Sequence, residues 1–257
     1  MLIAFDIGNT HIDLALFSDG VLIARDRMRT HGQSCNSEYA KQLMRFITTH
    51  TNRQSVKQAL IASVVRDMEA DLISACHQCD IVAHSVDSSW DLGLKIRYNN
   101  PQHVGIDRLL AASTAFAEAP PNTALVIADA GTAITVDLLS AEGTFLGGTI
   151  APGLQLMLKS LRAGTSLLPE IALDDCASLP ATSTPDGMRA GILHGAASLI
   201  DGLRDRLGET VANPILSILT GGDAQRLRPL TRSNWQCDSS LVLRGLYLAY
   251  ERNKLTL

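Results

Sequence analysis

The sequence predicts a mixed α/β protein that contains a duplicated unit, and three observations support this fold class. Along the chain, the hydrophobic pattern switches between the alternation of strands and the roughly 3.6-residue period of helices. An apolar strand, an Asp-x-Gly loop and a second strand occur twice, with Asp6 and Asp129 in matching positions. The length of 257 residues allows one large domain or two small ones.

The first half of the chain predicts three strands and then alternating helices and strands. Residues 1–5 are apolar and end at Asp6, after which Ile12, Leu14 and Leu16 alternate with other residues. The Pro-Pro pair at 120–121 stops the last helix of this half. In order, we expect strands over 1–5, 12–16 and 21–27, a helix from 38, a strand over 59–65, a helix over 67–76, a strand over 81–86 and a helix over 104–118.

The second half begins with a strand over 124–128 and continues as a similar unit. Thr184 is a plausible helix cap because Pro185, which suits a first helical position, follows it. In order, we expect further strands over 134–138 and 215–219, turns at Gly147-Gly148 and Pro152-Gly153, and helices over 154–162, 185–207 and 241–252.

The two copies are related by an offset of 123 residues, which aligns Asp6 with Asp129. At this offset the coinciding pairs are Leu2/Leu125, Asp6/Asp129, Gly8/Gly131 and Leu16/Leu139. The identities are few, but each copy combines a strand, an Asp-x-Gly loop with a nearby Thr, and a second strand. We therefore expect two domains, over residues 1–118 and 119–257, with the terminal helix able to pack back across the boundary.

Composition argues against several classes of protein. Hydrophobic residues are 46% and charged residues 19% of the chain, as in globular rather than disordered proteins. Apolar runs fall short of the ~20 residues of a membrane span, and Asp6 interrupts the N-terminal run that a signal peptide would need. A formal charge of −4 with 4% aromatic residues disfavours nucleic-acid binding. We expect a cytoplasmic protein whose partner is a small molecule, with no nucleic acid and no membrane.

The cysteines give no sign of a disulfide framework or a metal site. Their number, five, is odd, which fits reduced thiols in a chain of this size. Cys76 and Cys79 form one C-x-x-C pair, but a structural zinc site needs a second pair of ligands at comparable spacing. We interpret this pair as two small side chains at the end of a helix.

Three polar loops, each following an apolar strand, carry the functional signal. Glycine lets the backbone approach phosphate oxygens, and loop amides with Asn9, Thr10 or Thr132 can donate hydrogen bonds to them. Asp6 and Asp129 would be repelled by a polyphosphate unless cations lay between, so we interpret them as metal-binding groups. One loop alone is better explained as a tight turn, whereas the set favours nucleotide binding. The loops contain Asp-x-Gly at 6–8 and 129–131 and Thr-Gly-Gly-Asp at 220–223.

A further carboxylate, Asp107, lies beside Arg108 at the start of a predicted helix. Taken alone, Asp107 is explained by the helix dipole and Arg108 by a solvated surface charge. The wider context changes this interpretation, because six motifs follow one another between residues 2 and 224. They are Asp6-Ile7-Gly8-Asn9-Thr10, Tyr98-Asn99-Asn100-Pro101, Gly105-Ile106-Asp107-Arg108, Asp129-Ala130-Gly131-Thr132 with Thr135 and Asp137, Gly147-Gly148-Thr149-Ile150-Ala151-Pro152-Gly153, and Thr220-Gly221-Gly222-Asp223.

Each motif is common by itself, but the ordered set resembles the type III pantothenate kinase family over nearly the whole chain. The resemblance implies the actin-like and sugar-kinase fold, with two ribonuclease H-like domains facing each other across a cleft. It also implies transfer of the γ-phosphoryl group of ATP to pantothenate, which yields 4'-phosphopantothenate in the first step of coenzyme A synthesis. A homodimer, in which the partner completes the substrate pocket, is implied as well.

The resemblance also implies roles for individual residues. Asp6 would lie near Mg²⁺, and Asp129 would bind a potassium or ammonium ion. Asp107 would accept the proton of the pantothenate hydroxyl, and the Arg108 guanidinium could pair with its carboxylate. Thr184 stands in Ser183-Thr184 where the family usually has Asn-Thr. The implied ATP-binding residues are Asp6, Ile7, Gly8, Asn9, Thr10, His11, Ile12, Asp13 and Thr132, and the implied pantothenate-binding residues are Tyr98, Gly105, Ile106, Asp107, Arg108 and Thr184.

Two other readings remain open from the residues themselves. Asp6, Asp107 and Asp129 could be the carboxylates of a ribonuclease H-like two-metal nuclease, although the acidic balance and few aromatic residues argue against it. A nucleotide-binding regulatory accessory protein on the same fold would keep the phosphate loops but could dispense with Asp107. The presence of both Asp107 and Arg108 favours the kinase.

Overall fold

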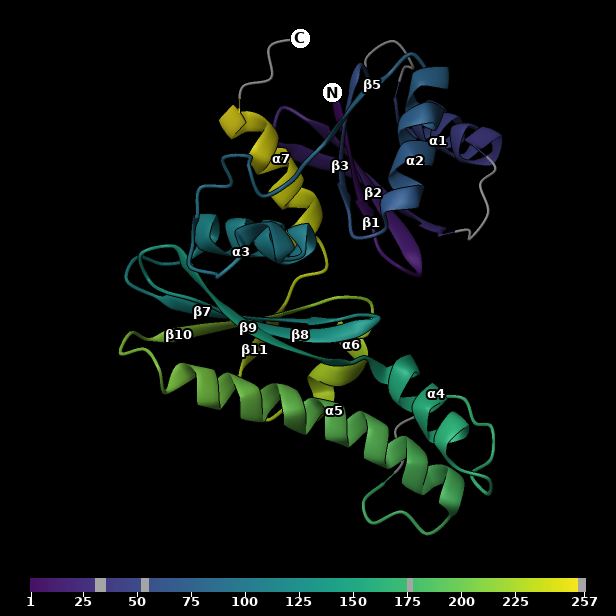
Figure 1. Cartoon of the computed structure of the whole chain (residues 1–257), viewed down its shortest axis with the longest axis vertical. Helices are drawn as coiled ribbons and strands as arrows, with labels where there is room; N and C mark the ends of the chain where they lie inside the picture. Colours follow the sequence, from purple (N-terminus) through teal and green to yellow (C-terminus); the bar gives the residue numbers. More distant parts are fainter. Residues whose placement is uncertain (31–35, 52–55, 175–177, 254–257) are drawn as a thin grey trace. The chain divides into compact units, whose positions relative to one another are not determined.

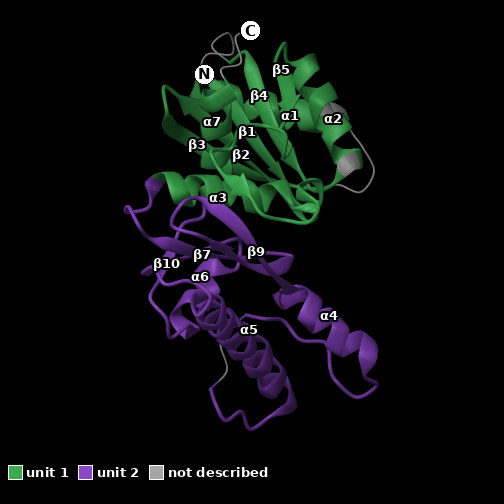
Figure 2. Cartoon of the chain, turned by 60° about the vertical axis from the view of Figure 1, so that its left-hand side comes forward, with its two compact units in different colours: residues 1–117, 240–257 green, residues 118–239 purple. Residues whose placement is uncertain are grey.

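The computed structural model, which describes residues 1–30, 36–51, 56–174 and 178–253, contains two β-sheets flanked by helices (Figure 1). Contacts divide the chain into unit 1, residues 1–117 with 240–257, and unit 2, residues 118–239 (Figure 2). The mixed α/β class predicted from the sequence is confirmed. The terminal helix α7 (Leu241–Asn253) belongs to unit 1 although it follows unit 2 along the chain.

Unit 1 follows the predicted order of three strands, helix, strand, helix and strand. Short β6 was not predicted, because two residues are too few for an alternating pattern to be recognised. The elements are β1 (Leu2–Ile7), β2 (His11–Ser18), β3 (Val21–Arg29), α1 (Asn36–His50), β4 (Gln58–Ser63), α2 (Arg66–Gln78), β5 (Val82–Ser85), β6 (Lys95–Ile96), α3 (Ile106–Glu118) and α7.

Unit 2 also contains the predicted elements, with boundaries shifted by a few residues. Short β11 and the four-residue α6 were not predicted. The elements are β7 (Ala124–Ala130), β8 (Ala133–Leu139), β9 (Thr144–Pro152), α4 (Leu154–Gly164), α5 (Thr184–Gly208), β10 (Ile215–Thr220), α6 (Ala224–Leu227) and β11 (Trp235–Cys237).

The strand order is the same in both units, which confirms the duplication. Unit 1 has the order β3-β2-β1-β4-β5, and the strands formed by residues 118–239 have the order β9-β8-β7-β10-β11 within the second sheet. In both, the first three strands are antiparallel and the next two are parallel to the first strand.

One of the four coincidences between the copies is not a structural equivalence. Leu2 pairs with Phe17 across β1 and β2, whereas Leu125 pairs with Leu139 across β7 and β8. Leu139 therefore corresponds to Phe17 and not to Leu16. The reason is that the loop after the first strand is one residue shorter in unit 2, so the offset changes there.

Each sheet has its own hydrophobic core. In unit 1, one face of β1, β2 and β4 packs against α1 and α2, while the other face packs against α7. Helix α3 is joined to α7 by the Thr114 hydroxyl, which donates to the Leu241 carbonyl at 2.8 Å. In unit 2, the apolar face of β7 and β8 packs against α5. Each Asp-x-Gly loop thus connects two strands that pack into the hydrophobic core of its own unit.

The turn predicted at Gly147-Gly148 is wrong, because both glycines lie inside β9. Gly148 is paired with Asp137, and a Cβ at Gly148 would collide with the Asp137 carboxylate and the Val136 carbonyl. Gly147 has a φ of +98° at a register shift between β8 and β9. These glycines permit a close strand approach and a bulge rather than a turn.

Cys76 and Cys79 are both buried, at the end of α2, as the sequence predicted for small side chains at a helix end. Burial raises the pKa of the Cys76 thiol to about 12, and the neighbouring Cys79 adds to this shift. Among the described residues, no group of three or more His, Cys, Asp or Glu side chains is placed to hold a metal ion. Nor do the described helices include one that is long and apolar enough to span a membrane.

Candidate functional site

The loop between β1 and β2 is short, polar and held by main-chain hydrogen bonds. The Gly8 amide donates to the His11 carbonyl at 2.9 Å, and the Thr30 amide donates to the Thr10 carbonyl at 3.1 Å. Asn9 and Thr10 are exposed. The loop therefore presents backbone and hydroxyl groups to solvent on a fixed frame.

Ile7 and Ile12, which the resemblance implies as ATP-binding residues, have fully buried side chains in the unit 1 core. A ligand at this loop can therefore contact these two positions only through their main chain. The sequence placed Ile12 in an alternating strand but Ile7 in the loop after the first strand, which in the structure extends to Ile7.

Two carboxylates flank this loop and face each other across the strand pair. Asp6 and Asp13 are register partners, so both side chains lie on the same face of the sheet. That face is opposite the core formed with α1 and α2, because Phe5 and Ile7 point the other way. Asp13 also pairs with Arg27 of β3, a residue that sequence reasoning missed.

Asp107 lies in the first turn of α3, where its carboxylate folds back onto the start of the helix. Its Oδ1 accepts a hydrogen bond from the Arg108 amide at 2.8 Å. Gly105 leaves room for this arrangement, since a Cβ there would collide with the same oxygen. Burial raises the pKa of Asp107 above its ordinary value of 3.8, against the opposing effects of the Arg108 amide and charge.

The other predicted pantothenate residues of unit 1 differ in exposure. Arg108 is only 8% exposed, so the alternative interpretation of this residue as a solvated surface charge is wrong. Ile106 is buried as well, whereas Tyr98 is 40% exposed. Along the stretch from Tyr98 to Arg108 the chain thus carries an exposed aromatic ring, a partly buried carboxylate and a buried guanidinium.

In unit 2, the loop between β7 and β8 is covered by two glycine-containing segments. Gly221 has a φ of +93°, and a Cβ there would collide with the Asp129 carboxylate. The Asp223 amide donates to the Ala130 carbonyl at 2.9 Å. The Asp-x-Gly and Thr-Gly-Gly-Asp loops, which the sequence places far apart at 129–131 and 220–223, are therefore neighbours.

The second covering segment is the Pro152-Gly153 turn, whose role sequence reasoning did not identify. The Gly153 amide donates to the Thr132 carbonyl at 3.0 Å. A Cβ at Gly153 would collide with the Gly131 carbonyl oxygen. The sequence indicates a turn at this glycine, between β9 and α4, but only the fold shows that the glycine contacts the β7–β8 loop.

The helix cap at the start of α5 is Ser183, and the prediction of Thr184 as the cap is wrong. The Ser183 hydroxyl accepts a hydrogen bond from the Asp186 amide at 3.3 Å and donates to the Asp186 carboxylate at 2.7 Å. Thr184 is the first helical residue, and Pro185 follows it within the first turn. The predicted cap was one residue too late, because Pro is tolerated at more than one position in the first turn of a helix and Pro185 therefore does not fix the first helical residue.

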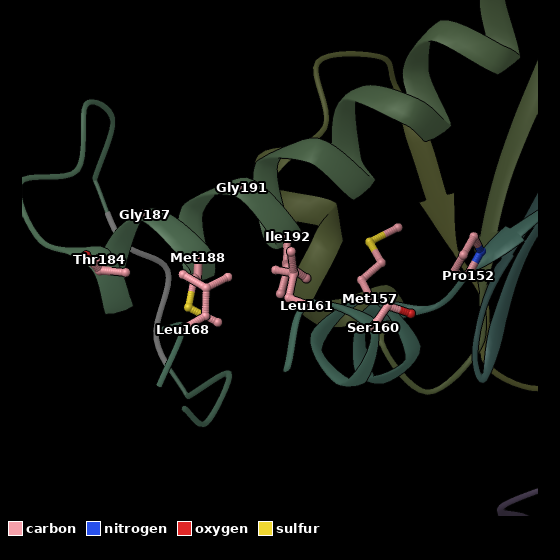
Figure 3. Close-up of a pocket in the computed structure, with 10 residues that line it drawn as sticks. All are labelled: Pro152, Met157, Ser160, Leu161, Leu168, Thr184, Gly187, Met188, Gly191 and Ile192. Carbon is pink, nitrogen blue, oxygen red and sulfur yellow. The ribbon is translucent and has the colours of Figure 1, made fainter. Parts of the chain in front are cut away.

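Thr184 instead lines a cavity of about 790 Å³ between α4 and α5 (Figure 3). Most of the lining is apolar, with Met157, Leu161 and Met188 among it, and Ser160 adds a second hydroxyl. Figure 3 places Thr184 at one end of the cavity and Pro152 at the other. Since Pro152 pairs with Ala133 next to Thr132, this cavity begins beside the Asp129 loop.

The predicted site residues thus form separate groups within each unit. In unit 1, Asp6 to Asp13 surround one loop, and Gly105 to Arg108 form the start of α3. In unit 2, Asp129 and Thr132 share a loop that Gly153 and Gly221 cover, and Thr184 lies at the far end of the cavity.

Comparison with known sequences adds to this geometry. A family model described as type III pantothenate kinase matches residues 2–206. A protein named type III pantothenate kinase from Thermus thermophilus is 37% identical over 246 residues, covering 96% of this chain and 97% of its own length. One of the same name from Anaeromyxobacter dehalogenans is 32% identical, covering 99% of this chain and 100% of its own.

Solved structures with low sequence identity share the fold. A Campylobacter jejuni protein named as a Baf family transcriptional activator superposes with a TM-score of 0.62 at 22% identity over 98% of both chains. Component A of (R)-2-hydroxyglutaryl-CoA dehydratase from Acidaminococcus fermentans gives 0.55 at 15% identity, covering 98% of this chain and 97% of its own. The neighbours have the actin-like ATPase and sugar-kinase fold, as the sequence predicted.

Proposed function

The chain belongs to the type III pantothenate kinase family, and we propose that it uses Asp107 to transfer the γ-phosphoryl group of ATP to pantothenate. As a member of this family it is a phosphotransferase that phosphorylates pantothenate in coenzyme A biosynthesis. The observation that carries the assignment of Asp107 is its placement, because the partly buried carboxylate is fixed at the start of α3 by the Arg108 amide.

Phosphoryl transfer to an alcohol depends mainly on positioning and on stabilisation of charge. Asp107 accepts the hydroxyl proton as the new P–O bond forms. The raised pKa of Asp107 makes its carboxylate a stronger base toward the hydroxyl proton of pantothenate. Tyr98 and Gly105 to Arg108 surround pantothenate, and Arg108 supplies the guanidinium for its carboxylate.

The loop between β1 and β2 holds the phosphates of ATP through its amides and the Asn9 and Thr10 side chains. Mg²⁺, which favours carboxylate and phosphate oxygens, fits Asp6 at the end of β1. When bound, it neutralises the charge that develops on the phosphates. Thr132 makes a further contact with ATP.

Asp129 binds the monovalent cation, potassium or ammonium. Three features support this role: a carboxylate at the end of β7, the register partner Thr220 beside it, and the Gly221 turn, whose backbone lies close against the carboxylate. Hard cations take such oxygen donors. When bound, the cation lowers the negative charge near the phosphates.

We propose a homodimer in which α4 and the start of α5 lie at the interface. In Figure 1 these two segments extend beyond the sheet of unit 2. Leu156 of α4 is 39% exposed and Leu167, in the segment after α4, is 92% exposed, and both lie close in sequence to residues that line the cavity with Thr184. Covering these side chains would bury apolar area, and Thr184 would contact pantothenate in the assembled enzyme.

A coupled assay of ADP release tests the function. We expect ADP release that requires pantothenate, and more of it with potassium or ammonium than with sodium. ATP binding without turnover would instead indicate the regulatory protein, and degradation of nucleic acid with Mg²⁺ alone would indicate the nuclease. Equal ADP release with and without pantothenate would show an ATPase of another kind.

A further inference from the structure

Thr30, the residue that follows β3, contacts the loop between β1 and β2, and none of the motifs assigned it a role. The Thr30 hydroxyl donates to the Gly8 carbonyl at 2.8 Å, and the Thr30 amide donates to the Thr10 carbonyl at 3.1 Å. Thr30 thus holds both ends of the Gly8–Thr10 segment. Because an amide that binds phosphate must point outward, fixing the carbonyls on its two sides fixes its direction.

Three residues earlier on β3, Arg27 completes a row of charged side chains across three strands. Asp6 pairs with Asp13, and Asp13 pairs with Arg27, so all three side chains lie on one face of the sheet. The Arg27 Nε and Nη2 atoms donate to the two Asp13 oxygens at 2.8 and 3.0 Å. This is the two-point fork that favours Arg over Lys.

The charges in this row explain why a cation is needed there. Like charges directly opposite each other on antiparallel strands repel, which applies to Asp6 and Asp13. A polyphosphate bound at the same loop adds further negative charge. Hydrogen bonding to Asp13 raises the pKa of the Arg27 guanidinium, against the effect of partial burial, and the charges of Asp13 and then Asp6 raise it further. Arg27 therefore stays charged beside both carboxylates.

Fold stability alone does not account for this pair. Arg27 is 46% exposed, and ion pairs at such exposed positions contribute little to stability. The buried residues of β3, Ala24 and Met28, point to the other face and supply the packing of the strand. The contacts of Arg27 and Thr30 are instead concentrated on the loop and its flanking carboxylates.

We propose that Arg27 and Thr30 are positioning residues for ATP: Arg27 neutralises Asp13 beside the phosphates, and Thr30 fixes the Gly8–Thr10 segment. This inference rests on the proposed function, in which the β1–β2 loop binds ATP. Neither residue is expected to touch the reacting atoms. Their loss should therefore weaken ATP binding more than it slows the chemical step at saturating substrate.

Thr30 is tested with a matched pair of substitutions. Thr30→Val keeps the shape but removes the hydroxyl donor, whereas Thr30→Ser keeps the donor. We expect Thr30→Val to raise the Kd for MgATP, measured by calorimetry, by roughly fivefold or more, since one hydrogen bond is lost. Thr30→Ser should stay within about twofold of the wild type. Equal affinity of the two variants would overturn the role of Thr30.

Arg27 is tested with a double-mutant cycle. Arg27→Gln should weaken ATP binding about tenfold, with and without Mg²⁺, because Asp13 then repels the phosphates. In a background of Asp13→Asn, the same Arg27→Gln change should alter the Kd by less than about twofold. If it still costs tenfold there, Arg27 contacts the phosphates directly and the neutralisation proposal is wrong.

The controls separate this inference from the proposed function. Arg25→Gln removes the same charge from the same face, two residues further from the loop, and should leave the Kd within about twofold. Circular dichroism confirms that each variant is folded, and Arg27→Met, which removes the same charge, serves if Arg27→Gln is not folded. A wild type that does not bind ATP would contradict the function itself. A wild type that binds ATP no more tightly than Arg27→Gln and Thr30→Val would contradict only this inference.

Discussion

Asp107 is the residue on which the proposed chemistry depends. We expect Asp107→Asn to lower kcat by ~10²-fold or more while ATP affinity changes little, because the base acts in the transition state. The isosteric amide can still accept the hydrogen bond of the Arg108 amide, so the start of α3 is preserved. Steady-state kinetics and calorimetric ATP binding measure the two effects. Near-normal turnover would remove Asp107 from the mechanism.

The pKa of Asp107 gives a pH dependence with a definite sign. Burial raises this pKa above 3.8, and a general base works only when it is deprotonated. The value of kcat/KM should therefore fall as the pH drops through the raised pKa, at a higher pH than for an exposed Asp. A pH profile of the wild type beside Asp107→Asn measures this. If kcat/KM falls at the same low pH in both proteins, a group other than Asp107 is responsible for that fall.

Single residues also show where the sequence was insufficient. Alternation placed Ile12 in a strand, but Ile7 was predicted in the loop and lies buried at the end of β1; the resemblance alone named both as ATP-binding. Ser183 and Thr184 are adjacent hydroxyl residues before the same helix, and only the contacts with Asp186 identify the cap. Arg27 was missed because its significance comes from Asp13 on the neighbouring strand, a pairing that depends on register.

At the scale of elements, the turn between β9 and α4 fixes the β7–β8 loop. We expect Gly153→Ala to destabilise the fold by about 1–3 kcal/mol, since its Cβ would collide with the Gly131 carbonyl. Gly202→Ala is the matched control, because it is an exposed position in α5 with no atoms near its Cβ. That change should stabilise by about 0.5–1 kcal/mol. Urea unfolding measures both, and equal effects would contradict the close contact.

The existence and order of the longer elements were predictable, whereas the glycines were harder to interpret. Strands and helices of about six or more residues carry enough hydrophobic periodicity to be recognised. Gly147 and Gly148 were predicted as a turn because a Gly-Gly pair usually indicates one. Within β9, Gly148 accommodates the Asp137 carboxylate of the adjacent strand and Gly147 lies at a register shift, and no local pattern reveals either feature.

At the scale of the whole molecule, the repeated strand order shows that two weakly similar segments of the sequence adopt the same arrangement of strands. Each copy places an Asp at the end of its first strand, followed by a Gly-containing loop. The sequence identified this duplication through the strand–loop–strand pattern. It did not reveal the change of offset, since a one-residue loop difference leaves every motif in place.

The assembly is tested by light scattering after size exclusion. We expect twice the chain mass of 27.6 kDa for the wild type, and the monomer mass for Leu167→Glu, because a charge would be buried at the interface. Val21→Glu, at an exposed apolar position of unit 1, should remain dimeric. A monomeric wild type at micromolar concentration would contradict the proposed homodimer.

Transfer of labelled phosphate tests the central claim most directly. With γ-³²P-labelled ATP, Mg²⁺, potassium and pantothenate, the label should appear in a phosphomonoester of pantothenate, and this product should be nearly absent with Asp107→Asn. Label that appears only as inorganic phosphate, or a product formed equally by Asp107→Asn, would contradict the account.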